Sequence, residues 1–204
     1  MSGTATVRDI TDLGAWSIRL LVAQALLSLL AIVVALAHGP GFSGENGSAA
    51  YALVATLQFI FFVVAGFVVL RWIYFATANA HAFGAEGLRC GPWLAVGSFF
   101  IPIANLVMPF QSMRDVWKAS VEPRDWEVVK ATPLLGWWWL FWLAGNIAGI
   151  IAFRRADAER YPDVGRTPET LIILSDGFTF AASLLLAAII RQLTALQQAR
   201  MNFV

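Results

Sequence analysis

Five long apolar stretches separated by short charged segments dominate the chain. They cover residues 20–37, 49–70, 93–113, 134–153 and 170–190. Each has about 20 residues, the number that an α-helix needs to cross a hydrocarbon core about 30 Å thick. None alternates apolar with polar residues, as the strands of a membrane barrel do. The pattern therefore predicts an all-α fold, a polytopic transmembrane helical bundle formed by residues 1–204 as a single domain.

The third stretch, 93–113, differs from the others. Pro102 removes a backbone hydrogen bond near its middle, Asn105 follows one turn later, and Pro109 restricts the chain again. This stretch is either a kinked span or a broken, re-entrant segment. The chain accordingly has four or five spans.

An amphipathic segment follows. Over residues 110–120 the apolar side chains fall on one side of a helix, and Arg114 and Lys118 fall towards the other. This pattern is typical of an interfacial helix that lies at the membrane surface. We expect Arg114 and Lys118 to contact lipid headgroups.

Composition supports a membrane protein and narrows the functions. Hydrophobic residues make up 59% of the chain and charged residues 13%, whereas a soluble domain has about 25% charged residues. The net charge of +1 argues against a nucleic-acid partner, because there is no basic block to neutralise phosphates. Cys90 is the single cysteine, which excludes an intrachain disulfide and a multi-cysteine metal site.

Familiar catalytic motifs are missing. The sequence has no metalloprotease, P-loop, nucleophile-elbow or dinucleotide-binding signature. We therefore expect no catalytic residues, no metal and no other cofactor, and we expect that the protein is not an enzyme.

The Lys and Arg residues suggest an orientation. The segment between the first two stretches has none, so it is expected outside. If the third stretch does not span, most of the 14 Lys and Arg residues lie on the side of the termini. The positive-inside rule then makes both termini cytoplasmic. The other side carries Arg154, Arg155, Arg160 and Arg166.

Asp176 is the one charged residue within the five stretches. A carboxylate in hydrocarbon normally faces protein or water and has a partner. Asn146 and Asp176 have similar calculated depths below the same membrane surface, so we hypothesise a polar cluster of Asn146 and Asp176, joined by Asn105. The cluster either fixes helix register or carries a proton, ion or polar-substrate step. The third alternative is that Asp176 is simply wetted.

Small residues predict close packing of two helices. Gly145 and Gly149 form a G-x-x-x-G pair in the fourth stretch, and Gly177 and Ala181 form a similar pair in the fifth. Such pairs let helix backbones approach each other within membranes. We interpret both pairs as packing surfaces.

Several sequence blocks in residues 71–153 are similar to a known family. They are Arg71-Trp72 with Asn79; Trp93 to Gly97 leading to Pro102 to Leu106; Pro109 to Gln111 with Met113, Arg114 and Trp117; and Gly136 to Trp139 with Trp142 and Asn146. In these blocks the chain resembles the bacterial membrane family known as domain of unknown function 4328. Members often carry a further basic residue where this chain has Tyr74-Phe75, so no role of that charge is carried over. The resemblance implies a bacterial inner-membrane protein and no particular reaction.

Together these observations favour a non-enzymatic membrane scaffold or partner-binding protein. Its expected partners are membrane lipids, together with other membrane proteins or a second copy of the chain. The first alternative is a small transporter or channel that uses the Asn and Asp cluster. The second is an enzyme acting on lipids, with Arg114 and Lys118 holding headgroup phosphates.

Overall fold

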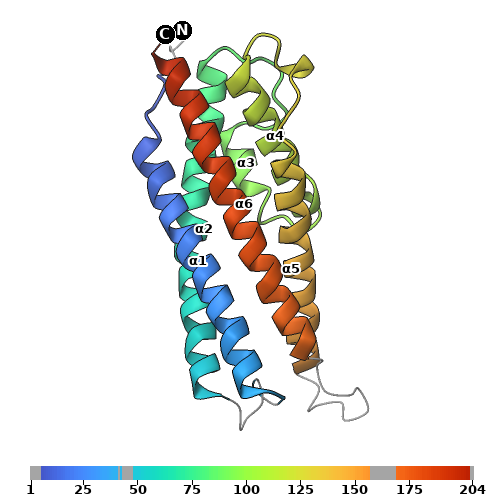
Figure 1. The fold of residues 1–204 in the computed structure, drawn as a ribbon. Coiled ribbons are helices and arrows are strands. Elements are labelled where there is room, and N and C mark those ends of the chain that lie inside the picture. Colours follow the sequence, from blue (N-terminus) through green and yellow to red (C-terminus); the bar gives the residue numbers. More distant parts are fainter. Residues whose placement is uncertain (1–5, 41, 43–47, 157–168, 203–204) are drawn as a thin grey trace.

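The computed structural model describes residues 6–40, 42, 48–156 and 169–202. Four helices are long: α1 (Thr11–His38), α2 (Ala49–Ala82), α5 (Leu134–Ala156) and α6 (Glu169–Met201). Two shorter α-helices, α3 (Pro92–Gly97) and α4 (Met108–Val121), and two 3₁₀ turns, η1 (Ala104–Leu106) and η2 (Trp126–Val128), lie between α2 and α5 (Figure 1). These residues include no strand, which confirms the all-α prediction. Arg160 and Arg166 lie outside the described residues.

Four helices are long and apolar enough to cross a membrane, namely α1, α2, α5 and α6. The third stretch is not among them, because it is not one continuous helix. It is helical in α3, turns irregularly from Ser98, and resumes as η1 and α4. Pro102 lies at this interruption, where its missing N–H and fixed φ prevent a continuous helix. The stretch is therefore broken, as the prolines predicted.

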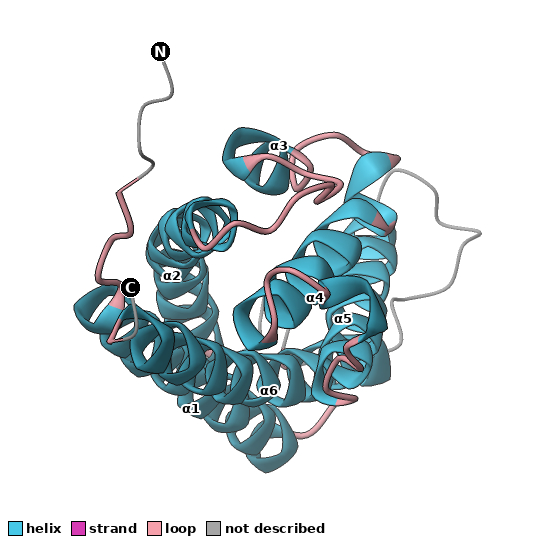
Figure 2. Cartoon of the chain, turned by 90° about the horizontal axis from the view of Figure 1, so that it is seen from above, coloured by secondary structure: helices cyan, strands magenta, loops and turns pink. Residues whose placement is uncertain are grey.

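The four spans form an open, curved row in the order α2, α1, α6, α5. α6 packs along both α1 and α5, and α1 packs along α2. No interface of similar extent joins α2 to α5 in the described part of the chain. Seen from above, α4 lies inside the curve of the row and α3 near its open side (Figure 2).

The segment 83–133, which we call the cap, fills the row at the end where both termini lie (Figure 1). With 34 and 33 residues, α2 and α6 are about 50 Å long and extend past a hydrocarbon core of about 30 Å. Their ends hold the cap, since α4 contacts both helices.

α4 is more buried than a helix lying on a surface would be. Its Ser112, Asp115 and Ser120 side chains are each 2% exposed. The reason is its position: α4 packs against α2, α3, α5, α6 and η2. The predicted amphipathic helix exists, but its polar side faces the interior of the cap as well as the surroundings.

Candidate functional site

A hydrogen-bonded group of two amides and one hydroxyl joins the cap to the spans; we call Asn79, Ser120 and Gln197 the framework. Gln197 Nε2 donates to Ser120 Oγ on α4 and to the Ala76 carbonyl on α2, both at 2.9 Å. Gln197 Oε1 accepts from Asn79 Nδ2 at 3.0 Å. The three side chains are at most 2% exposed. Because buried amides are costly unless bonded, these bonds hold α2, α4 and α6 in one arrangement.

The framework also fastens the N-terminal segment. Asn79 Oδ1 accepts from the Arg8 amide and Asn79 Nδ2 donates to the Arg8 carbonyl, both at 2.8 Å. At the same C-terminal end of α4, Arg200 donates to the Ser120 and Val121 carbonyls. This arrangement of the framework and its neighbours suits a structural role.

A second polar group lies inside the cap around Asp115. The Asp115 carboxylate is 3.7 Å from Arg89 Nε and 3.9 Å from Arg114 Nε. Burial raises the pKa of the Asp115 carboxyl, and the two guanidinium groups partly oppose this. Burial and the charge of Asp115 also raise the pKa of the nearby Cys90 thiol, so this cysteine is not an activated nucleophile.

A third polar group lies within the spans and contains Asp176. Gln58 Nε2, from α2, donates to Asp176 Oδ1 on α6 at 3.0 Å and to Ser28 Oγ on α1 at 3.2 Å. Gln24 lies one turn before Ser28 and is 5% exposed. We call Gln24, Ser28, Gln58 and Asp176 the intramembrane cluster. Asp176 thus has a protein partner, as expected of a carboxylate in a span.

The partners expected for Asp176 were Asn146 and Asn105, and the structure does not bring them to it. Asn146 is exposed and its Nδ2 donates to the Trp142 carbonyl of its own helix at 2.8 Å. Asn105 lies in η1, close to the cap end of α5. The hydrogen bond from Trp139 Nε1 to the neighbouring Leu106 carbonyl, at 3.1 Å, shows this position. Asp176 is near the opposite end of the bundle, seven residues after α6 begins. In the described structure Asp176 is therefore hydrogen-bonded to Gln58 and not to Asn146 or Asn105.

Depth along the helices could have identified the actual partners. Ser28 lies ten residues before the end of α1, and Gln58 lies nine residues after the start of α2. Both lie at nearly the depth of Asp176 below the same surface. Gln24 and Gln58 are also the two amide side chains in the first two apolar stretches.

Arg114 and Lys118 both have contacts within the cap. Arg114 approaches Asp115, and its guanidinium carbon lies 5.8 Å from the centre of the Phe110 ring. Lys118 Nζ donates to the Glu127 carbonyl at 3.1 Å. The Arg114 side chain remains 34% exposed.

The glycine pair of α5 lies against α6. A Cβ atom at Gly145 would come within 3.3 Å of Phe178 Cβ, and one at Gly149 within 3.2 Å of Ser175 Oγ. Ser175 Oγ also donates to the Gly145 carbonyl at 3.1 Å. At Gly177 a Cβ would meet nothing within 4 Å, so this glycine is not at a close contact.

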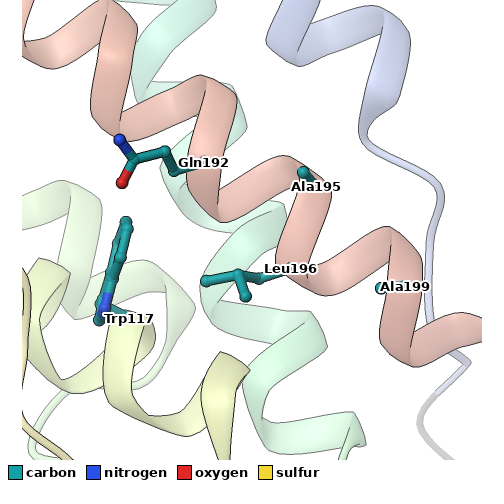
Figure 3. Close-up of a pocket in the computed structure, with 5 residues that line it drawn as sticks. All are labelled: Trp117, Gln192, Ala195, Leu196 and Ala199. Carbon is teal, nitrogen blue, oxygen red and sulfur yellow. The ribbon is translucent and has the colours of Figure 1, made fainter.

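One surface pocket lies between the cap and α6. It has a volume of about 410 Å³ and is lined by Trp117 of α4 and by Gln192, Ala195, Leu196 and Ala199 of α6 (Figure 3). The Trp117 ring points towards the Gln192 amide, and the small side chains of the two alanines leave space at the surface of α6 (Figure 3). The pocket is wide open to the surroundings.

Comparison with known proteins gives a family. No curated protein and no solved structure matches the chain. One family model matches residues 45–195, which include α2, the cap, α5 and most of α6. Trp72, Asn79 and Trp117, which carried the resemblance in the sequence, are all buried. Asn79 and Trp117 lie where the cap meets the spans, and Trp72 donates to Thr194 of α6. Because the match covers well over half of the chain, this protein belongs to the family described as "Domain of unknown function (DUF4328)".

Proposed function

We propose that this chain is a non-enzymatic membrane scaffold whose cap is seated in one leaflet of the inner membrane and binds its lipids. The observation that carries the proposal is the position of residues 98–107, which we call the apolar loop. Phe100, Ile101 and Ile103 of this loop are 72%, 50% and 84% exposed. Adjacent apolar side chains are rarely left in water, and lipid tails would cover them.

The depth of the apolar loop supports lipid as its surroundings. The Phe99 ring lies 6.2 Å from the Trp142 ring, centre to centre, and Trp139 bonds the Leu106 carbonyl. Trp139 and Trp142 follow the start of α5 by about 8 and 12 Å. Since α5 is a candidate span from its first residue, the loop reaches about a third of the way along it. The segment is thus proposed as re-entrant.

The loop backbone also suits this depth. Irregular backbone is tolerated in a membrane only where its polar groups are bonded. The Asn105 amide donates to the Ile101 carbonyl at 2.7 Å, and the Leu106 carbonyl accepts from Trp139. The loop therefore combines hydrogen-bonded backbone groups with apolar side chains, as a segment within a membrane requires.

Anionic headgroups are the proposed polar contacts. The Arg89 and Arg114 side chains are 48% and 34% exposed and belong to the cap just beyond the loop. A guanidinium can bind a phosphate through two parallel hydrogen bonds. Lys118 adds a third positive charge on the same helix as Arg114. Lipids with exposed phosphates are therefore the proposed ligands.

The proposed orientation has the cap and both termini in the cytoplasm. With four spans, the ten Lys and Arg residues outside the 154–166 segment lie on the cap side of the chain or along its helices. The positive-inside rule favours this side as cytoplasmic.

Two single-cysteine proteins test the apolar loop, in a Cys90→Ser background. One carries Ile103→Cys; the control carries Val128→Cys in η2 of the cap, which is 83% exposed. Each is labelled with an environment-sensitive fluorophore in liposomes. We expect blue-shifted emission and quenching by nitroxide-labelled acyl chains at position 103, and quenching by aqueous iodide at position 128.

The two positions are matched in exposure and side-chain shape, so the comparison isolates their surroundings. If position 103 responds to iodide and not to the lipid nitroxide, the apolar loop is in water and the proposal fails. The Cys90→Ser protein without a new cysteine gives the background signal.

The intramembrane cluster favours a second candidate function, a small transporter or channel. A carboxylate within a span is a common feature of ion and proton pathways. The first requirement of this candidate is that the cluster binds a cation.

A further inference from the structure

The intramembrane cluster brings polar side chains from three helices to one level. Ser28, Gln58 and Asp176 are about 15, 14 and 11 Å from the helix ends opposite the cap, at 1.5 Å per residue, and Gln24 lies one helical turn further along α1, at about 21 Å. This level is within the hydrocarbon region of the four spans. The cluster is therefore separate from the cap and from the proposed lipid contacts.

Both amide donors of Gln58 are used. The two Gln58 Nε2 hydrogens serve Ser28 Oγ and Asp176 Oδ1, and a primary amide has no third donor. Asp176 Oδ2 is buried and accepts no hydrogen bond from the described residues. Gln24 Oε1 is in the same state, on a side chain that is 95% buried. Two oxygen acceptors thus lack a positive partner.

A basic side chain does not fill this role in the described structure. The ion pairs found there involve Arg89, Arg114 and Arg200, and all of them are in the cap region. Tyr51, in the first turn of α2, is a titratable group that interacts electrostatically with Asp176. It has no positive charge in either of its protonation states.

We propose that Gln24, Ser28, Gln58 and Asp176 form a binding site for one small monovalent cation, either a proton or an alkali-metal ion. The oxygens of a carboxylate, an amide and a hydroxyl are ligands that suit hard cations. One carboxylate balances one positive charge, which favours a monovalent ion over a divalent one. A proton would satisfy the same two oxygens, since a protonated Asp176 becomes a donor.

Thermal unfolding of the purified full-length protein in detergent tests the site. The melting temperature is measured in NaCl, KCl and N-methylglucamine chloride at equal ionic strength, and across pH. A ligand that binds only the folded state stabilises it by mass action. At ion concentrations above the midpoint for binding, each tenfold increase in the free concentration of the ion that binds should raise Tm by about 3 to 6 °C. A bound proton should instead raise Tm as pH falls.

Variants make the test specific. Asp176→Asn should lose the ion or pH response, and Gln24→Leu should shift its midpoint at least about tenfold, because one oxygen ligand is removed. Asp12→Asn removes an exposed carboxylate and should respond as the wild type does. Asp115 adds its own pH dependence, so the proton result is the difference between the wild-type and Asp176→Asn curves.

The proposal is overturned if wild type and Asp176→Asn respond identically to each cation and to pH, or if Asp12→Asn loses the response equally. If Asp176→Asn does not fold, Gln24→Leu decides, and an unshifted midpoint overturns the site. The lipid contacts of the cap are measured separately by the fluorophore experiment, so either proposal can fail without the other.

Discussion

Asp115 and Asp176 are both carboxylates in apolar surroundings, but their neighbours differ. Asp115 lies in the cap beside Arg89 and Arg114, whereas Asp176 in a span receives a neutral amide from Gln58. A guanidinium lowers the cost of a buried carboxylate directly. A neutral amide lowers this cost only weakly. We therefore infer a missing cation at Asp176 and not at Asp115.

Asp115 should make stability depend on pH. Its pKa in the folded protein is above the ordinary value because of burial, so the folded state binds the proton more tightly than the unfolded state does. The free energy of unfolding should therefore be greatest below the ordinary carboxyl pKa and fall as pH rises through the folded pKa. Denaturant titrations between about pH 4 and about pH 7 would measure this fall.

The control for this prediction is a second carboxylate of the cap. Asp115→Asn should flatten the pH dependence, and Asp125→Asn, which changes an exposed residue of the same segment, should leave the slope at the wild-type value. Equal slopes in wild type and Asp115→Asn would contradict the assignment.

The sequence identified Asp176 as important but did not identify its contacts. The reason is that the sequence does not give the rotation of each helix about its own axis. Rise per residue gives a depth for every helix position, and on that basis Asn146 and Asp176 match. Which way a side chain faces depends on how the helices pack, and Asn146 faces outward and bonds its own helix. A search of all polar residues at that depth would have included Ser28 and Gln58.

At the scale of elements, the close contact of α5 with α6 was predictable and the burial of α4 was not. A G-x-x-x-G pair indicates a close helix contact by itself, and Gly145 and Gly149 lie at one. The surroundings of α4 depend instead on α2 and α6 extending beyond the membrane on either side of it. From the sequence alone, the polar ends of these two helices, which carry Asn79 and Gln197, are typical of exposed helix. Only the hydrogen bonds of the framework show that these side chains are buried.

Gly145 should tolerate no large side chain. Gly145→Leu would place its Cβ within 3.3 Å of Phe178 Cβ, and overpacking of this kind costs about 1–3 kcal/mol. We expect that loss in SDS unfolding titrations. Gly136→Leu is the matched control, since it is on the same helix and a Cβ there meets nothing within 4 Å; a loss of the same size in both would show that the α5–α6 contact is not the cause.

At the scale of the whole molecule, composition was enough to predict a membrane bundle. Long uncharged runs fix the four spans because hydrocarbon excludes unbonded backbone and charge. The span count needed the effect of Pro102 and its neighbours on the third stretch. The order of the helices in the row follows from side-chain packing, which no periodicity in the sequence reports.

The even number of spans makes a topology prediction. In a Cys90→Ser background, Val128→Cys in the cap and His38→Cys at the end of α1 should react with a membrane-impermeant maleimide from opposite faces. If the cap is cytoplasmic, Val128→Cys labels in inverted vesicles and His38→Cys in intact spheroplasts. Labelling of both from one face would contradict the arrangement of α1 and the cap.

The open row has a consequence for the membrane itself. If the apolar loop is seated in the membrane as we propose, the protein occupies one leaflet with the four spans and this loop, and it occupies the other leaflet with the four spans alone. A body with unequal areas in the two leaflets acts as a wedge. Such a wedge fits best where the bilayer bulges towards its broad end, so this chain should concentrate in regions of that curvature and help to stabilise them.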